Sequence, residues 1–264
     1  QYTPAAGWAQ SIVYHRDVLQ DASYASSMAV ALGGDASVAT NGFWAALTMA
    51  TTLKLPMLFY IEDNDLGISV RGDMQTPGGD IAKNLASFTN LFIRNGNGSD
   101  PHDASGKLAE AVAHVRAGHG PALVRLTVPR LSSHSGPDNQ KGYRSDEEIA
   151  ADQARDPLPA LRNYLVPSLL SESAWQELEA EVARDVEVAL TAARARAMPD
   201  ASTVARHVYC EADAPDAMGG LSRAEREALG GSDVPQEGGD LLRFAEAVRR
   251  TLRHELSVNR KVVV

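Results

Sequence analysis

Two polar side chains, separated by one predicted strand–helix–strand unit, are the first candidates for chemistry in this sequence. Asp35 follows the apolar stretch SMAVAL and two glycines, and Asn64 follows the apolar stretch MLFYI. In open α/β sheets, ligands bind beyond the carboxyl ends of the strands, so we expect the two side chains to lie close together. Carboxylate and amide oxygens suit Mg²⁺, which shares its other positions with water and substrate phosphates. The helix after Asp35 adds backbone N–H groups that suit phosphate.

Two other interpretations of these residues stay open at this point. Asp and Asn are common turn residues after strands and need no ligand there. The sequence Asp63-Asn64-Asp65 also resembles the Asp-x-Asp motif of haloacid-dehalogenase-type phosphatases, in which the first Asp is a nucleophile. Those enzymes have Thr or Val two residues after the second Asp, where this chain has Gly67, and no convincing paired-acid motif follows Lys83.

The composition disfavours several classes of partner and site. Acidic residues number 34 against 25 Lys and Arg, and the formal net charge is −9. Nucleic acids and anionic membranes both attract basic surfaces, so neither is expected as a partner. Cys210 is the single cysteine, so no internal disulfide forms and the Cys pairs of a structural zinc site are lacking. The apolar runs are too short to cross a bilayer, and we expect a cytoplasmic protein.

Alternating predicted strands and helices must position Asp35 and Asn64. Short apolar runs predict strands and amphipathic stretches predict helices, and their alternation indicates an α/β fold with a mostly parallel sheet flanked by helices. A polar loop over residues 129–145 follows, and a loop of this length is either functional or disordered. Further predicted helices form a C-terminal helical extension. The predicted strands are 27–32, 57–61, 90–94 and 121–128, and the predicted helices are 41–53, 80–88, 102–117, 146–154 and 173–197.

Composition also divides the chain into predicted domains. Residues 1–209 form the α/β domain and its helical extension, and residues 210–239, rich in Gly, Ala, Asp and Pro, form a linker with one short helix, SRAEREAL. Residues 240–264 begin a further domain, in which apolar residues recur at helical spacing before the strand-like sequence KVVV. Because the first residue is Gln and the last residues read as a buried strand, we expect this sequence to be a piece of a longer protein.

An ordered set of motifs resembles one known family. Gly34-Asp35-Ala36 is followed, one strand–helix–strand unit later, by Asp63-Asn64 within KLPMLFYIEDNDLGIS. QTPGGDIAKNLASF, GHGPALVRL, RLSSHSGPD, YRSDEEI and RDPLPALRNYL then follow in order. From about residue 29 to residue 209 the chain resembles the α component of thiamine-diphosphate-dependent 2-oxo acid dehydrogenases, the E1 enzymes of the pyruvate and branched-chain complexes. The resemblance implies the thiamine-diphosphate-binding fold.

The resemblance implies roles for individual residues. Asp35 and Asn64 would ligate Mg²⁺ together with the backbone carbonyl of Leu66. Ala36 and Ser37 would line the diphosphate through their backbone amides.

The polar loop carries the remaining implied residues. Arg130 and His134 match an Arg and a His of the loop that closes over thiamine diphosphate, and we expect His134 to be catalytic. Ser135 matches a serine that is phosphorylated in mitochondrial relatives.

The motifs depart from the family pattern at three positions near the expected site. Ala36 replaces a Gly, which costs about 1–2 kcal/mol if the residue has a positive φ. Asp63 replaces the first Asn of the pair, and Asp65 replaces a Gly. These two acids would either weaken cofactor binding or face solvent.

The resemblance also implies an activity and an assembly. The chain is expected to act in the oxidative decarboxylation of a branched-chain 2-oxo acid or pyruvate, with acyl transfer to the lipoyl group of an E2 acyltransferase. The segment LLRFAEAVRRTLRHELSVNRKVVV resembles the start of an E1 β part, which implies a fused β half, in a dimer or a heterotetramer-like assembly. In this family a Glu of the β half assists the cofactor. A catalytically degenerate scaffold within such a complex is the alternative.

Overall fold

The computed structural model describes residues 1–206 and 242–258. The chain divides into two compact units, Gln1–Val186 and Glu187–Val264. The predicted linker at 210–239 and the sequence KVVV lie outside the described residues. The predicted boundary at residue 209 lies there too, so the predicted domain limits stay a prediction.

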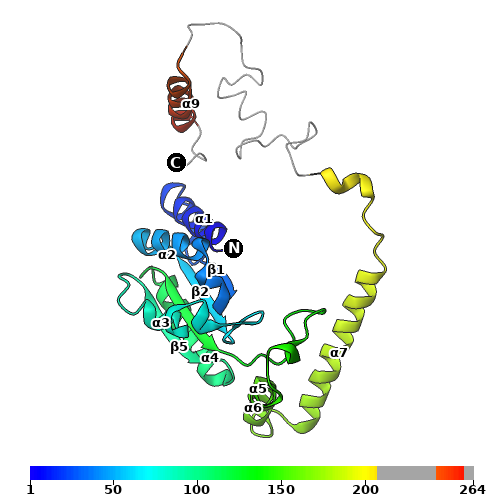
Figure 1. Cartoon of the computed structure of the whole chain (residues 1–264). Helices are drawn as coiled ribbons and strands as arrows, with labels where there is room; N and C mark the ends of the chain where they lie inside the picture. The colour runs from blue at the N-terminus through cyan, green and yellow to red at the C-terminus, as the bar shows by residue number, and fades with distance from the viewer. Residues whose placement is uncertain (207–241, 259–264) are drawn as a thin grey trace. The chain divides into compact units, whose positions relative to one another are not determined.

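A parallel sheet of four strands forms the centre of the first unit (Figure 1). All three strand pairs are parallel, as predicted from the alternating pattern. In the register, Gly34 lies beside Glu62 and Asp63 lies beside Thr127. The strands, in spatial order, are β1 (Ala29–Gly34), β2 (Met57–Asp63), β6 (Ala122–Thr127) and β5 (Phe92–Asn97).

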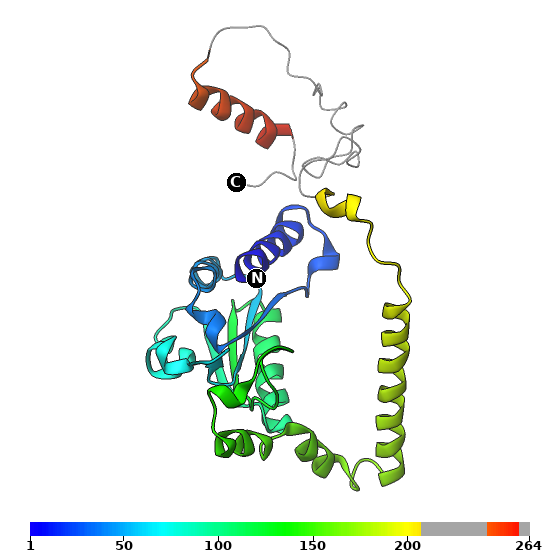
Figure 2. The same ribbon diagram turned by 45° about the vertical axis from the view of Figure 1, so that its right-hand side comes forward.

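Helices cover both faces of this sheet (Figure 2). On one face Phe43 and Leu47 of α2 pack with Phe59 of β2. On the other face Val115 of α4 packs with Leu58 of β2. Burial on both faces explains why β2 is continuously apolar instead of alternating. The first face carries α1 (Tyr2–Val13), α2 (Asn41–Leu53) and α3 (Ile81–Asn84), and the second carries α4 (Pro101–Arg116).

The segment after β6 has the predicted helical extension. The loop at 129–145 contains only a short 3₁₀ helix, Gln140–Gly142. Ser145 then begins α5 with a capping box, because its side chain accepts from the backbone N–H of Glu148 and the Glu148 side chain accepts from the N–H of Ser145. The helices are α5 (Asp146–Gln153), α6 (Pro157–Leu165) and α7 (Glu172–Arg194).

Two predicted elements differ from the structure. The helix expected at 80–88 is only α3, because the Asn84 side chain donates to the carbonyl of Pro77 and the next residues close 3₁₀ turns. The strand expected at 90–94 starts later, at Phe92, because Asn90 has a φ of 62° and its side chain donates to the carbonyl of Thr51.

In the second unit, the described residues form the end of α7, a 3₁₀ helix at Ala201–Ala205, and α9 (Phe244–Val258). The helix predicted from the apolar spacing near the end of the chain is therefore confirmed over the described residues, and the further domain stays a prediction. Phe244, Val248 and Leu252 are exposed on α9. No helix among the described residues is long and apolar enough to span a membrane.

Candidate functional site

The carboxyl ends of β1 and β2 open into one cavity of about 370 Å³. The antiparallel hairpin of β3 (Leu66–Gly67) and β4 (Val70–Arg71) follows β2 at this edge. All of the predicted site residues except Arg130 line the cavity. Its lining consists of Gly34, Asp35, Ala36, Ser37, Asn64, Leu66, Gly67, Ile68, Gln75 and His134.

Asp35 is the buried acid of this cavity, with 7% of its surface exposed. Its Oδ2 atom is buried and has no hydrogen-bond partner among the residues that the structure describes. Burial, and then the negative charge of Asp63, raise the pKa of the Asp35 carboxyl, while the backbone N–H groups of Asp35 and Asn64 act in the opposite direction. A buried, unpartnered carboxylate oxygen is costly in isolation, and a bound cation would remove that cost.

Asn64 stands at the next strand end. Its Oδ1 accepts a hydrogen bond from the backbone N–H of Leu66 at 3.1 Å, which closes a local turn. This bond fixes the amide group beside the cavity, and the oxygen keeps a second lone pair. The described residues contain no cluster of three or more His, Cys, Asp or Glu side chains suited to a metal. A cation in this cavity would therefore be held by one carboxylate, one amide and backbone oxygens, which are hard ligands suited to Mg²⁺.

The backbone after Asp35 turns into a 3₁₀ helix, Asp35–Ala39. Ala36 is not among the residues with positive φ, so the strain that a left-handed conformation would cause does not arise. A Cβ atom placed on Gly67 would lie 2.7 Å from the Cβ of Ala36. The methyl group of Ala36 is thus accommodated by the missing side chain at Gly67.

Tyr2 is a neighbour of the site that the sequence did not reveal. Its hydroxyl lies 2.6 Å from the Ser37 Oγ, and Ser37 Oγ donates to the carbonyl of Gly34 at 2.5 Å. Burial raises the pKa of the Tyr2 hydroxyl, against the smaller opposite effect of the Ser37 hydrogen bond. These contacts fix the Ser37 side chain at the cavity. No sequence motif links Tyr2 to Ser37, because only the packing of α1 against β1 brings them together.

Asp63 does not face solvent, which was one of the two expectations for it, and its effect on cofactor binding stays a prediction. It is 6% exposed, and its Oδ2 accepts a hydrogen bond from Arg125 Nε at 2.6 Å. Its Oδ1 accepts from the backbone N–H of Asp65 at 3.0 Å. Both oxygens are engaged, so Asp63 is badly placed to act as a nucleophile, which disfavours the phosphatase alternative.

Asp65 is exposed and has a φ of 62°, a left-handed conformation that Asp tolerates better than most residues. Its Oδ1 accepts from the backbone N–H of Gly72 at 3.2 Å. This acid therefore faces solvent and holds the β3–β4 hairpin.

Arg130 does not line the cavity, and its guanidinium binds residues of its own loop and the cavity-lining Ile68. It is 6% exposed and donates to the carbonyl of Ile68, to Asp138 Oδ2 at 3.2 Å and to the Tyr143 hydroxyl at 2.7 Å. Asp138 Oδ2 also accepts from the Tyr143 hydroxyl at 2.7 Å and from the backbone N–H of His134 at 2.8 Å. The Asp138 carboxylate thus gathers three donors and fixes the backbone of His134.

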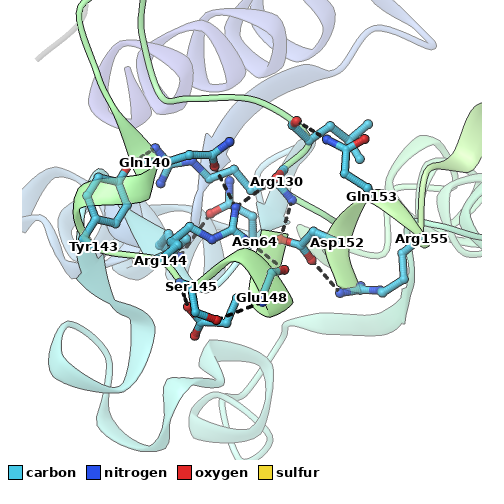
Figure 3. Close-up of polar contacts among 12 residues, drawn as sticks. Asn64, Arg130, Gln140, Tyr143, Arg144, Ser145, Glu148, Asp152, Gln153 and Arg155 are labelled. Atoms are coloured by element: carbon cyan, nitrogen blue, oxygen red, sulfur yellow. Dashed lines mark hydrogen bonds and ion pairs between the residues drawn. The ribbon is translucent and has the colours of Figure 1, made fainter. Parts of the chain in front are cut away.

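The loop is tied to α5 by a second set of bonds (Figure 3). Arg144 donates to the carbonyl of Arg130 at 3.1 Å and to Asp152 Oδ2 at 2.5 Å. The same Asp152 oxygen accepts from the backbone N–H of Arg130 at 3.1 Å, and Gln153 donates to the carbonyl of Leu131 at 2.5 Å. The helical extension therefore supports the loop that carries His134.

Comparison with known proteins agrees with this arrangement. The sequence model of the family described as "Dehydrogenase E1 component" matches residues 7–202. The chain belongs to the dehydrogenase E1 component family. This confirms the family suggested by the ordered motifs and the α/β fold expected for it.

Several α subunits resemble this E1 chain. It is 33% identical over 157 residues to the 3-methyl-2-oxobutanoate dehydrogenase subunit alpha of Mycobacterium tuberculosis, covering 59% of the E1 chain and 41% of that relative. It is 32% identical over 209 residues to the chloroplastic pyruvate dehydrogenase E1 component subunit alpha-3 of Arabidopsis thaliana. That match covers 78% of this chain and 48% of the relative. For the pyruvate dehydrogenase E1 component subunit alpha of Mycoplasma pneumoniae, the identity is 27% over 190 residues. That match covers 72% of this chain and 51% of the relative.

The E1 chain thus spans about half the length of the curated relatives it matches. The family match ends at residue 202, before the segment that resembles an E1 β part. The fusion to a β half stays a prediction.

Proposed function

We propose that this chain is the α-type part of an E1 component that binds thiamine diphosphate and Mg²⁺ and acts in the oxidative decarboxylation of a 2-oxo acid. The observation that supports this best is the buried Oδ2 of Asp35, which has no partner in a cavity that it shares with Asn64. An unpartnered buried carboxylate beside an amide oxygen fits a hard cation.

Each residue of the cavity has a proposed part in binding. Asp35, Asn64 and the backbone carbonyl of Leu66 would hold Mg²⁺, and the backbone amides of Ala36 and Ser37 would face the diphosphate. When bound, thiamine diphosphate supplies the electron sink that permits loss of carbon dioxide from a 2-oxo acid. Magnesium neutralises charge on the diphosphate oxygens.

His134 is the proposed catalytic residue of this chain. The residue lines the cavity, and its backbone N–H donates to Asp138. An imidazole there can donate a hydrogen bond to phosphate or move a proton near neutral pH. The loop 129–145 would also exclude water from the site, and Arg130 would hold this loop in the observed state.

The partners and substrate follow the same proposal. A β-type half, fused or separate, would supply the Glu that assists the cofactor, and the acyl group would pass to the lipoyl group of an E2 acyltransferase. The assembly would be a dimer or heterotetramer-like. The names of the relatives support both a branched-chain 2-oxo acid and pyruvate.

Titration calorimetry with thiamine diphosphate, with and without Mg²⁺, tests the proposal on the purified chain. We expect binding that requires Mg²⁺. Asn64→Ala should weaken it by about 2–3 kcal/mol, since an inner-sphere ligand is lost.

Asn163→Ala removes the same amide from an exposed position of α6 and should bind the cofactor as the unmodified chain does. Equal affinity of Asn64→Ala and Asn163→Ala would contradict the metal assignment. Absence of cofactor binding by the unmodified chain, alone and with a β-type partner, would favour the degenerate scaffold.

A further inference from the structure

Arg125 and Asp63 form a buried ion pair directly beneath the loop that carries Asn64. The Arg125 Nε–Asp63 Oδ2 distance is 2.6 Å, and the two side chains are 11% and 6% exposed. Arg125 lies on β6 opposite Ile61 of β2, so its side chain reaches from the sheet to the end of the neighbouring strand. The ion pair therefore lies at the end of β2, directly before Asn64 in the chain.

The other oxygen of Asp63 continues this contact into the loop. Asp63 Oδ1 accepts from the backbone N–H of Asp65 at 3.0 Å, and the Asp63 carbonyl accepts from the N–H of Val128 at 2.8 Å. Asn64 lies between Asp63, which carries this carboxylate, and Asp65, whose backbone N–H donates to it. Whatever orients the Asp63 carboxylate also orients the backbone on both sides of Asn64.

Arg125 is itself held by further partners. Its Nη1 donates to Asp80 Oδ2 at 3.2 Å and to Asn95 Oδ1 at 3.1 Å. Asn95 lies on β5 and Asp80 precedes α3. The guanidinium thus links the end of β2 to two other elements. Its planar group donates several hydrogen bonds in fixed directions, which the ammonium of Lys cannot reproduce.

We propose that Arg125 is a positioning residue for magnesium and diphosphate binding, which acts by neutralising Asp63 and fixing the loop of Asn64. This inference rests on the proposed function. Arg125 does not line the cavity of Asp35 and Asn64, so it would affect cofactor affinity through Asp63.

Electrostatics supports the assignment. Asp35 and Asp63 follow paired positions of adjacent strands, Gly34 and Glu62, and adjacent strands lie about 4.8 Å apart. Two buried carboxylates that follow neighbouring strand ends repel each other, and both would repel a diphosphate. Arg125 offsets part of the charge of Asp63, so less of that repulsion reaches Asp35, the proposed anionic ligand.

The partners of Arg125 predict an asymmetry between the single variants. In Asp63→Asn the guanidinium keeps Asp80 and Asn95, and no buried charge is left alone. In Arg125→Gln the carboxylate of Asp63 stays buried without its cation. The second change should therefore weaken the site much more than the first.

The test measures thiamine diphosphate affinity by calorimetry over a series of Mg²⁺ concentrations, with thermal unfolding of each cofactor-free variant alongside. Arg125→Gln should weaken Mg²⁺-dependent affinity by about tenfold or more, as changes behind a metal ligand commonly do. Asp63→Asn should weaken the affinity much less than Arg125→Gln does, because the amide oxygen can still accept from the backbone N–H of Asp65. The double variant D63N/R125Q should recover most of the loss.

Arg94→Gln is the matched control, because Arg94 also lies on the sheet but pairs with the exposed Glu110. It should leave the affinity unchanged. A folded Arg125→Gln protein with unchanged affinity, or a double variant no better than Arg125→Gln, would overturn the proposal. If Arg125→Gln does not fold, the same affinity is measured for Arg125→Lys. Unchanged affinity of the Arg125→Lys protein would then overturn the proposal. Failure of the unmodified chain to bind the cofactor, alone and with a β-type partner, would instead refute the proposed function.

Discussion

Asp35, a residue of the proposed magnesium site, illustrates how cation binding and fold stability can make opposite demands on one side chain. Its Oδ2 is buried with no partner, and its pKa is raised chiefly by burial. A carboxylate in that state stabilises a bound cation but destabilises the fold without one.

Replacing Asp35 should therefore separate the two effects. Asp35→Asn is expected to raise the free energy of unfolding of the cofactor-free protein by about 1–2 kcal/mol at neutral pH, and to abolish Mg²⁺-dependent cofactor binding. Urea unfolding and calorimetry on the same samples measure both quantities.

The increase in the free energy of unfolding expected for Asp35→Asn should depend on pH in one direction. Because the folded pKa of Asp35 is raised, the folded state binds its proton more tightly than the unfolded state, and the destabilisation develops as pH rises through the folded pKa. The advantage of Asp35→Asn should thus vanish in acid. A variant less stable than the unmodified chain at neutral pH would refute this account.

His134 differs from Asp35 because it is exposed and reaches the cavity from a loop. His134→Ala should lower turnover with a 2-oxo acid and a β-type partner by about 10²-fold or more, with little change in unfolding temperature. Steady-state assays measure the effect. His119→Ala, an exposed histidine elsewhere, should be neutral, and full activity of His134→Ala would leave the residue without a catalytic role.

At the scale of elements, the loop 129–145 owes its order to side chains rather than to regular structure. One oxygen of Asp138 accepts from the Arg130 guanidinium, the Tyr143 hydroxyl and the His134 backbone. These bonds, led by that of Tyr143, lower the pKa of the Asp138 carboxyl. The contribution of Asp138 to loop order is therefore present above its unfolded pKa and is lost as pH falls through the folded pKa.

Asp138→Asn should release this loop without unfolding the sheet. We expect proteolytic cleavage within 129–145 to become several-fold faster, since an amide replaces a charge-assisted acceptor of three donors. Limited proteolysis followed by mass spectrometry locates the cuts. Asp146→Asn, which loses an exposed ion pair with Lys141 at the start of α5, should behave as the unmodified chain, and equal cleavage of both variants would refute the role of Asp138.

At the scale of the whole molecule, the described residues supply the magnesium and diphosphate side of the proposed site. The chain spans about half the length of the curated relatives it matches. Nothing in the described cavity corresponds to the Glu of a β half that the family resemblance implies.

The isolated chain should accordingly be a poor catalyst. With thiamine diphosphate, Mg²⁺, a 2-oxo acid and an artificial electron acceptor, we expect turnover about 10²–10⁴-fold below that of the same chain mixed with a β-type partner, because an acid–base group is missing. Comparable turnover by the chain alone would show that its own residues complete the active site.

The sequence by itself determined the fold class and the position of the candidate site. Alternation of apolar strands with amphipathic helices is a local property, and it predicted the parallel sheet of β1, β2, β5 and β6. Because parallel strands place their carboxyl ends at one edge, the positions of Asp35 and Asn64 after β1 and β2 were enough to predict a common cavity. The order of short motifs was enough to predict the family.

Only the tertiary structure decided which side chains pair around that cavity. Asp63 meets Arg125 across 62 positions of sequence and Tyr2 meets Ser37 across 35, and no local pattern links such residues. The same applies to Arg130, which matches a cofactor-loop residue but bonds to Ile68, Asp138 and Tyr143. A sequence motif records residue type and spacing, whereas the partner of a buried charge depends on which elements pack against it in the folded chain.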